Sequence, residues 1–185
     1  EENVVLWRDY RVTVLQNRLF RLEKSKEKRF RDEATQSVWF RDMPPQAFTV
    51  TAAEEECVIQ TDCCTLVLKP ERKNCYVVLG GVRRKLENAG NLLGTARTLD
   101  GYDGDLHVGG ETKTKQNKHK FSRISLCAGV CSKTGVSVIS DGDSLTLSSQ
   151  GKVQPQRASG SDEYVFAYGN DYRAAVRALY LITGS

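Results

Sequence analysis

Hydrophobic and polar residues alternate along the first part of the chain, a pattern typical of half-buried β-strands. Between residues 4 and 24, every second position of two segments is apolar: Tyr10, Val12 and Val14 in the first, Phe20 and Leu22 in the second. The polar residues between them are Arg11, Thr13, Arg21 and Glu23. The pattern predicts two strands joined by a hairpin turn at Gln16-Asn17 and followed by a solvated turn over Lys24–Asp32.

Strand-length apolar or alternating runs recur along the rest of the chain. They predict further strands at Val38–Phe40, Phe48–Thr51, Cys57–Thr61, Cys64–Lys69, Cys75–Leu79, Gly135–Ser140, Ser144–Ser148, Lys152–Gln154 and Glu163–Tyr168. Turn signals separate these runs, including Pro70–Asn74, and the three runs between residues 135 and 154 predict a meander. We expect Val82–Glu87 to lead out of the sheet into a loop. Strands at this spacing indicate antiparallel sheets.

One helix is expected near the end of the sequence. Asp171 is placed to cap Tyr172–Ile182, and Gly184 stands where a helix would end. Its apolar stripe consists of Tyr172, Ala175, Val176 and Leu179, which we expect to pack on the sheets. The sequence therefore predicts a mainly β fold, an antiparallel β-sandwich with one C-terminal α-helix, as a single domain over residues 1–185.

Composition and charge narrow the classes of partner. The net charge of +4 is small, and the one dense basic run, Lys113–Lys120, lacks the interleaved aromatic residues that stack on bases. We expect an exposed surface loop there and no nucleic-acid partner, although an adaptor that binds nucleic acid through this run is an alternative. The sequence contains no apolar run near 18 residues, so no membrane span is expected.

The six cysteines are too few for a disulfide scaffold, and their spacings complete no zinc pattern. We expect them to be buried free thiols, including the adjacent pair Cys63 and Cys64. The sequence contains no Asn-x-Ser/Thr sequon and no cationic-then-apolar start. These features favour an intracellular protein, and they also fit a mature secretory chain whose signal has been removed.

Glycines and carboxylates crowd together in Asn88–Asp105, between segments that resemble strands. Its glycines are Gly90, Gly94, Gly101 and Gly104, and its carboxylates are Asp100, Asp103 and Asp105. This composition predicts a structured loop in which the aspartates bond to nearby backbone. Their order does not reproduce a calcium-binding loop, and His107 and His119 are isolated. We expect no metal and no cofactor.

Three stretches carry a family resemblance: Phe30–Pro44, Asn91–Gly104 and Glu163–Gly184, in that order along the chain. Together they resemble the domain that precedes the catalytic barrel in glycoside hydrolase family 31, which contains α-glucosidases and α-xylosidases. The resemblance implies a galactose-mutarotase-like β-sandwich that packs on a (β/α)₈ barrel. It also implies that residues 111–121 are a Lys-rich insertion and that the helix at 171–182 leads toward a barrel absent from this chain.

The same resemblance implies a function. The family cleaves α-glycosidic bonds with retention, using two carboxyl groups that belong to the barrel. The chain would then be the non-catalytic N-terminal domain of an α-glucosidase-type enzyme, lacking both catalytic aspartates. Its loop would reach the hydroxyl groups of an α-linked oligosaccharide at the active-site rim through Arg97, Asp100, Tyr102 and Asp103.

The alternative is a free-standing carbohydrate-binding or protein-interaction module with the same fold. Aromatic side chains on the surface would favour sugar binding, because sugar rings stack on them. We expect Trp7, Trp39 and Phe40 to be buried instead.

Overall fold

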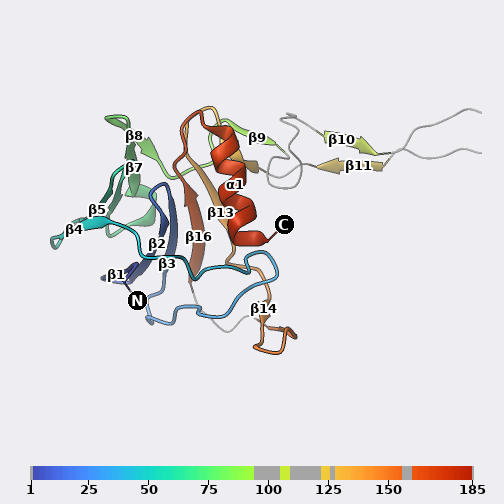
Figure 1. Ribbon diagram of the computed structural model, residues 1–185, viewed down its shortest axis with the longest axis horizontal. Helices are drawn as coiled ribbons and strands as arrows, with labels where there is room; N and C mark the ends of the chain where they lie inside the picture. The colour runs from blue at the N-terminus through green and yellow to red at the C-terminus, as the bar shows by residue number, and fades with distance from the viewer. Residues whose placement is uncertain (1, 94–104, 109–121, 126–127, 156–159, 185) are drawn as a thin grey trace, which may run out of the picture.

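The computed structural model describes residues 2–93, 105–108, 122–125, 128–155 and 160–184. Over these residues the fold is mainly β, with two five-stranded antiparallel sheets, three two-stranded sheets and one α-helix. The helix lies against one of the large sheets, and the other large sheet packs on the opposite side (Figure 1). The predicted β-sandwich with a C-terminal helix is confirmed.

The first sheet joins the beginning of the chain to its end. Its strands, in spatial order, are β1 (Val4–Trp7), β2 (Tyr10–Gln16), β3 (Leu19–Lys24), β16 (Ser161–Phe166) and β13 (Ser137–Ser140). The central strand β3 pairs with β2 on one side and over six residues with β16 on the other. Residues 19–23 are all buried, so β3 is covered on both faces and not half-buried as its alternation suggests.

The second sheet is a meander in which spatial order follows chain order. Its strands are β4 (Phe48–Ala52), β5 (Cys57–Thr61), β6 (Thr65–Leu68), β7 (Tyr76–Leu79) and β8 (Val82–Lys85). A short 3₁₀ helix, η1 (Arg72–Asn74), occupies the turn predicted before β7. The prediction that Val82–Glu87 leaves the sheet was wrong, because Gly80-Gly81 turns the chain back and β8 pairs with β7.

The main core lies between the two large sheets. The first sheet contributes Tyr10, Val12, Val14, Phe20 and Leu22, all predicted from the alternation, and the second contributes Cys57, Ile59, Leu66, Leu68 and Val77. A second core lies on the outer face of the first sheet. There Tyr164 and Phe166 of β16 pack with residues of the helix.

The helix, α1 (Tyr172–Thr183), has the predicted caps. The Asp171 carboxylate accepts a hydrogen bond from the Ala174 N–H at 3.1 Å, and Gly184 ends the helix with a φ of 78°. Its buried residues are Ala175, Ala178, Leu179 and Ile182. The predicted stripe is confirmed, since Ala175 and Leu179 are buried and the half-buried Tyr172 and Val176 pack against the same core. The buried face of α1 contacts β12, and the small Ala175 and Ala178 side chains on that face allow the helix to approach closely.

The remaining strands form small sheets. The pairs are β9 (Asn91–Leu93) with β12 (Ala128–Ser132), β10 (Asp105–Val108) with β11 (Ser122–Ser125), and β14 (Thr146–Leu147) with β15 (Val153–Gln154). The predicted meander holds for the β14–β15 hairpin but not for Ser137–Ser140, which pairs with β16. The Lys-rich segment 111–121 connects β10 to β11 and lies outside the described residues.

The segment from Lys24 to Phe40 differs most from its prediction. Ser25 and Arg31 are buried, so Lys24–Asp32 is not a solvated turn throughout. Val38–Phe40 is not a strand. The Trp39 and Phe40 N–H groups instead donate to the Ile182 carbonyl at 2.9 and 3.0 Å, which ties this segment to the end of α1.

Candidate functional site

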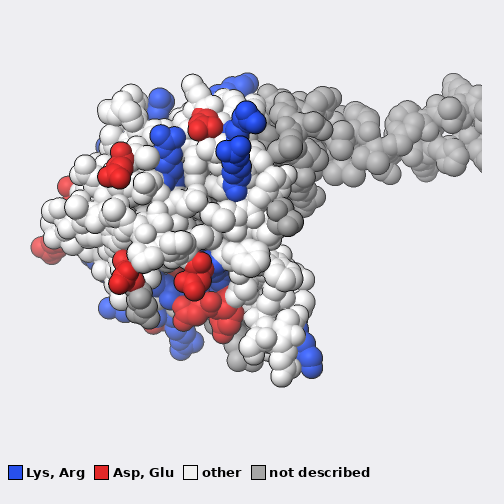
Figure 2. All heavy atoms as spheres, in the orientation of Figure 1, with Lys and Arg blue, Asp and Glu red and all other residues white. Residues whose placement is uncertain are grey.

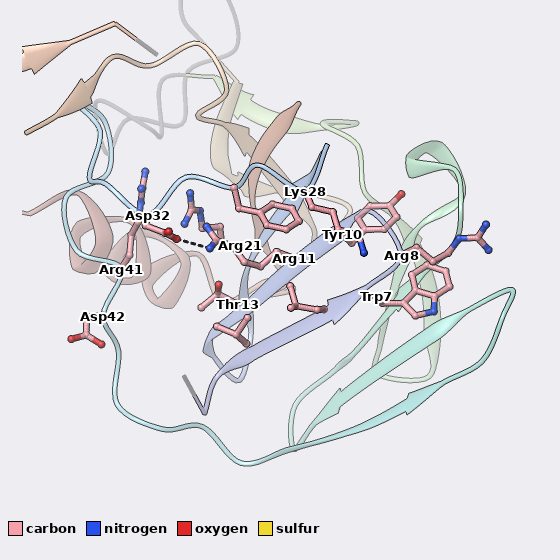
Figure 3. A pocket seen from close by; sticks show the side chains of 13 residues that line it. Trp7, Arg8, Tyr10, Arg11, Thr13, Arg21, Lys28, Asp32, Arg41 and Asp42 are labelled. Atoms are coloured by element: carbon pink, nitrogen blue, oxygen red, sulfur yellow. Dashed lines mark hydrogen bonds and ion pairs between the residues drawn. The ribbon is translucent and has the colours of Figure 1, made fainter. Parts of the chain in front are cut away.

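A pocket of about 650 Å³ lies on the outer face of the first sheet, beside β1 and β2. The strands supply Leu6, Arg11 and Thr13, and segment 28–42 crosses above them to supply Phe30 and Asp32 (Figure 3). We call this hollow the outer pocket.

Strand register explains why these residues share one face. Leu6 is paired with Arg11, and Thr13 with Arg21, so their side chains project away from the sandwich core. The polar positions of the sequence alternation therefore form the floor of the outer pocket. Leu6 adds an exposed apolar surface to that floor.

Arg11 is the central polar group of the outer pocket. Its Nε and Nη2 donate to the two Glu23 oxygens at 2.6 and 3.0 Å, and its Nη1 donates to Asp32. Its guanidinium carbon lies 5.0 Å from the centre of the Phe30 ring. Burial lowers the pKa of Arg11, but the bonds and charges of Glu23 and Asp32 outweigh burial and raise it overall. Arg11 is therefore a fixed cation with its charge already balanced.

A buried network of charged groups anchors segment 28–42 to the sheet below. Arg31 Nη1 donates to the Asp141 carbonyl at 2.9 Å, and Arg41 Nη2 donates to the Asp141 carboxylate at 2.9 Å. The Thr35 hydroxyl donates to the same carboxylate. Because these partners come from distant parts of the chain, the network holds the segment, and with it the wall of the outer pocket, in one position.

The two aspartates of the outer pocket lack the enclosed, apolar surroundings that a general acid needs. A retaining glycosidase needs two carboxyl groups about 5 Å apart, one kept protonated by an apolar environment. Asp32 and Asp42 line the pocket, but both are exposed to solvent and Asp32 is paired with Arg11. The groups that line the outer pocket include the Arg11 guanidinium over the Phe30 ring, the exposed Leu6 side chain and the Thr13 hydroxyl.

The structure does not test the rim-loop residues singled out from the sequence. Arg97, Asp100, Tyr102 and Asp103 all lie outside the described residues, as does His119. The structure does place the two ends of their loop, because β9 ends at Leu93 and β10 begins at Asp105. The contacts proposed for these residues with substrate stay predictions.

A second surface feature was missed by the sequence reasoning. Trp39 and Phe40 are 57% and 53% exposed, which contradicts the prediction that they are buried, whereas Trp7 is buried as expected. Tyr180 and Leu181 of α1 are also exposed and directly precede Ile182, the residue that accepts the Trp39 and Phe40 N–H bonds. We call these four residues the apolar patch. The area around this end of α1 shows few charged side chains in Figure 2.

One sequence signal could have revealed part of the apolar patch. Tyr180 and Leu181 do not follow the helical spacing of the buried residues, so an apolar pair there has no place in the core. The exposure of Trp39 and Phe40 has no comparable signal, because it depends on the backbone bonds to Ile182.

The described residues offer no cluster of metal ligands, and their cysteine thiols are buried or half-buried. No group of three or more His, Cys, Asp or Glu side chains there could hold a metal ion. Cys57, Cys64 and Cys75 are buried free thiols, as predicted, Cys63 is a half-buried free thiol, and Cys131 is buried. Within the same residues, no helix has the length and hydrophobicity to span a membrane.

Comparison with known proteins adds no family assignment. No protein-family model matches the chain, and no curated protein matches it significantly. The resemblance to glycoside hydrolase family 31 therefore rests on the three motifs alone.

Proposed function

We propose that this chain is the non-catalytic N-terminal β-sandwich of a retaining α-glycosidase of the α-glucosidase type. In this proposal it packs on a (β/α)₈ barrel and lends the loop between β9 and β10 to the rim of the active site. The observation that carries the proposal is the apolar patch of Trp39, Phe40, Tyr180 and Leu181.

The apolar patch has the properties of a covered surface. It consists of four exposed large apolar side chains from two segments that meet at Ile182, and exposed apolar surface of this kind is typical of an interaction site. Backbone bonds to Ile182 hold both of its segments in place, so little ordering is required on docking. Two of the three family-like motifs, Phe30–Pro44 and Glu163–Gly184, meet at this patch.

The outer pocket supports a non-catalytic role for the chain. Its two aspartates are exposed and lack the enclosed, apolar surroundings of a general acid. Hydrolysis at the outer pocket would therefore need carboxyl groups from another part of the enzyme.

The first test follows the protein from its natural source. An antibody against this chain should capture a polypeptide or complex much heavier than the chain alone, and that material should hydrolyse a chromogenic α-glucoside. The purified 185-residue chain should show no turnover. Turnover by the isolated chain, or captured material without α-glucosidase activity, would contradict the proposal.

A second test introduces a matched pair of substitutions into the complete enzyme, once the first test has identified it. Leu181 and Leu145 are 41% and 40% exposed, but only Leu181 belongs to the apolar patch. Leu181→Ser should lower the thermal stability and activity of the complete enzyme, whereas Leu145→Ser should not. In the isolated chain the two variants should behave alike, because each removes a solvent-exposed side chain.

The outer pocket favours a second candidate function, a free-standing carbohydrate-binding module. Calorimetry of the isolated chain with maltose, isomaltose and xylosyl-oligosaccharides separates the two candidates. Appreciable affinity that is lost in Phe30→Ala supports the binding module. Absence of binding supports the enzyme fragment.

A further inference from the structure

The two edges of the second sheet are unequally protected. Strand β8 forms one edge and carries three cations in four residues, Arg83, Arg84 and Lys85. Strand β4 forms the other edge and contains neither a charge nor a proline (Figure 1). It pairs with β5 over all five residues without a bulge, and residues 49–52 are exposed. Charges, prolines and bulges are the usual means of preventing strand addition, and β4 has none of them.

The free backbone groups of β4 can be assigned from its hairpin. The Ala53 N–H donates to the Glu56 carbonyl at 2.8 Å, and hydrogen bonding alternates along an antiparallel pair. The backbone groups of Thr49 and Thr51 therefore point toward β5, and those of Phe48, Val50 and Ala52 point away from the sheet. Among the described residues, no backbone bond outside the sheets involves residues 48–52.

We propose that β4 pairs with β4 of a second copy of this chain, antiparallel, about a twofold axis through Val50. Two five-stranded sheets would then become one continuous sheet. Val50 would form a hydrogen-bonded pair with its own copy, and Thr49 would lie opposite Thr51. Pairs of β-branched and hydroxyl side chains are favourable across antiparallel strands.

The charge distribution around β4 favours the antiparallel pairing of two copies over the parallel one. The acidic run Glu54–Glu56 follows β4, and the uncharged segment Pro44–Gln46 precedes it. In the antiparallel register about Val50, the acidic run of one copy lies opposite the uncharged segment of the other. A parallel pairing would place the two acidic runs side by side, which is unfavourable. The strand is thus complementary to itself, as a twofold interface requires.

Sedimentation equilibrium on the 185-residue chain tests the pairing. The concentration range is about 10 μM to about 1 mM, because one five-residue strand pair is a small interface that should dissociate at such concentrations. We expect a weak dimer. Val50→Lys places two cations together on the twofold axis and should raise the dissociation constant at least about tenfold. Val82→Lys is the matched control, because Val82 lies on the opposite edge strand of the same sheet and is 47% exposed against 42% for Val50. It should leave the dimer unchanged.

Amide hydrogen exchange identifies the surface involved. Dimer formation should slow exchange at Phe48, Val50 and Ala52, and should leave Thr49 and Thr51, already paired with β5, unchanged. A chain that stays monomeric over the whole range overturns the proposal, as does a dimer that withstands Val50→Lys. A dimer in which exchange at Phe48, Val50 and Ala52 is not slowed also overturns the proposal. The proposed enzyme role is unaffected by any of these results, because it concerns a different surface.

Discussion

Arg21 and Asp162 form a buried two-point ion pair although 141 residues separate them in the chain. Arg21 Nε donates to Asp162 Oδ1 at 2.9 Å, and Nη2 donates to Oδ2 at 2.7 Å. The two residues belong to the neighbouring strands β3 and β16. Burial lowers the pKa of Arg21, but the hydrogen bonds and charge of Asp162 more than compensate and raise it, so the guanidinium stays protonated. The pair ties the first strands of the chain to its last.

Asp162→Ala should destabilise the chain by about 3 kcal/mol or more, because it leaves the Arg21 cation buried without its principal partner. The neighbouring Glu163 pairs with Arg72 at a partly exposed position, so Glu163→Ala should cost about 1 kcal/mol or less. Urea denaturation measures both values. Equal losses would show that burial does not set the strength of these pairs.

Gly160→Ala should be strongly destabilising. A Cβ built at Gly160 would lie 2.0 Å from the Lys24 carbonyl oxygen, so the backbone of β3 would have to move. We expect a loss of about 3 kcal/mol by denaturant unfolding. Gly151 also has a positive φ but has no atom within 4 Å of its Cβ position, so Gly151→Ala should cost only about 1 kcal/mol. A similar loss in both variants would exclude the clash as the cause.

Asp171→Ala should destabilise the chain by about 1 kcal/mol, because the Ala174 N–H loses its acceptor at the start of α1. Asp171→Asn should retain most of the stability, since its amide oxygen can accept the same bond. Thermal unfolding followed by circular dichroism compares the two. A loss in the asparagine variant as large as that in the alanine variant would contradict the capping role.

Stability should fall as the pH rises above about 9. Burial raises the pKa of the Cys64 thiol to about 11, from an ordinary value of 9.0. Below pH 9 the thiol is protonated in both states. Between 9 and 11 it ionises in the unfolded chain but not in the folded chain, which favours unfolding by at most about 1.4 kcal/mol per pH unit.

Urea denaturation across this pH range should show a shallower decline in Cys64→Ala than in the parent chain. The comparison uses the slope with pH, because the variant also loses the Cys64 Sγ bond to the Asn17 carbonyl. Burial also raises the pKa values of Tyr10, Tyr164 and Tyr168, whose contributions begin at higher pH. Identical slopes in the two chains would exclude Cys64 as a source of the alkaline decline.

The sequence pattern within short segments predicted several strands and the C-terminal helix correctly. Period-two alternation located β2 and β3 and their core residues, because neighbouring strand residues must point to opposite faces. The caps Asp171 and Gly184 were predicted correctly because capping involves only residues within one turn. The mainly β fold class followed from these local signals.

Contacts between distant residues decided the rest. Pairing of β13 with β16, burial of Arg21 against Asp162, and exposure of Trp39 and Phe40 all depend on partners more than 20 residues away. The outer pocket likewise exists only because segment 28–42 is held over β1 and β2. A sequence pattern constrains which face a residue presents, but which surface covers that face depends on how the whole chain packs.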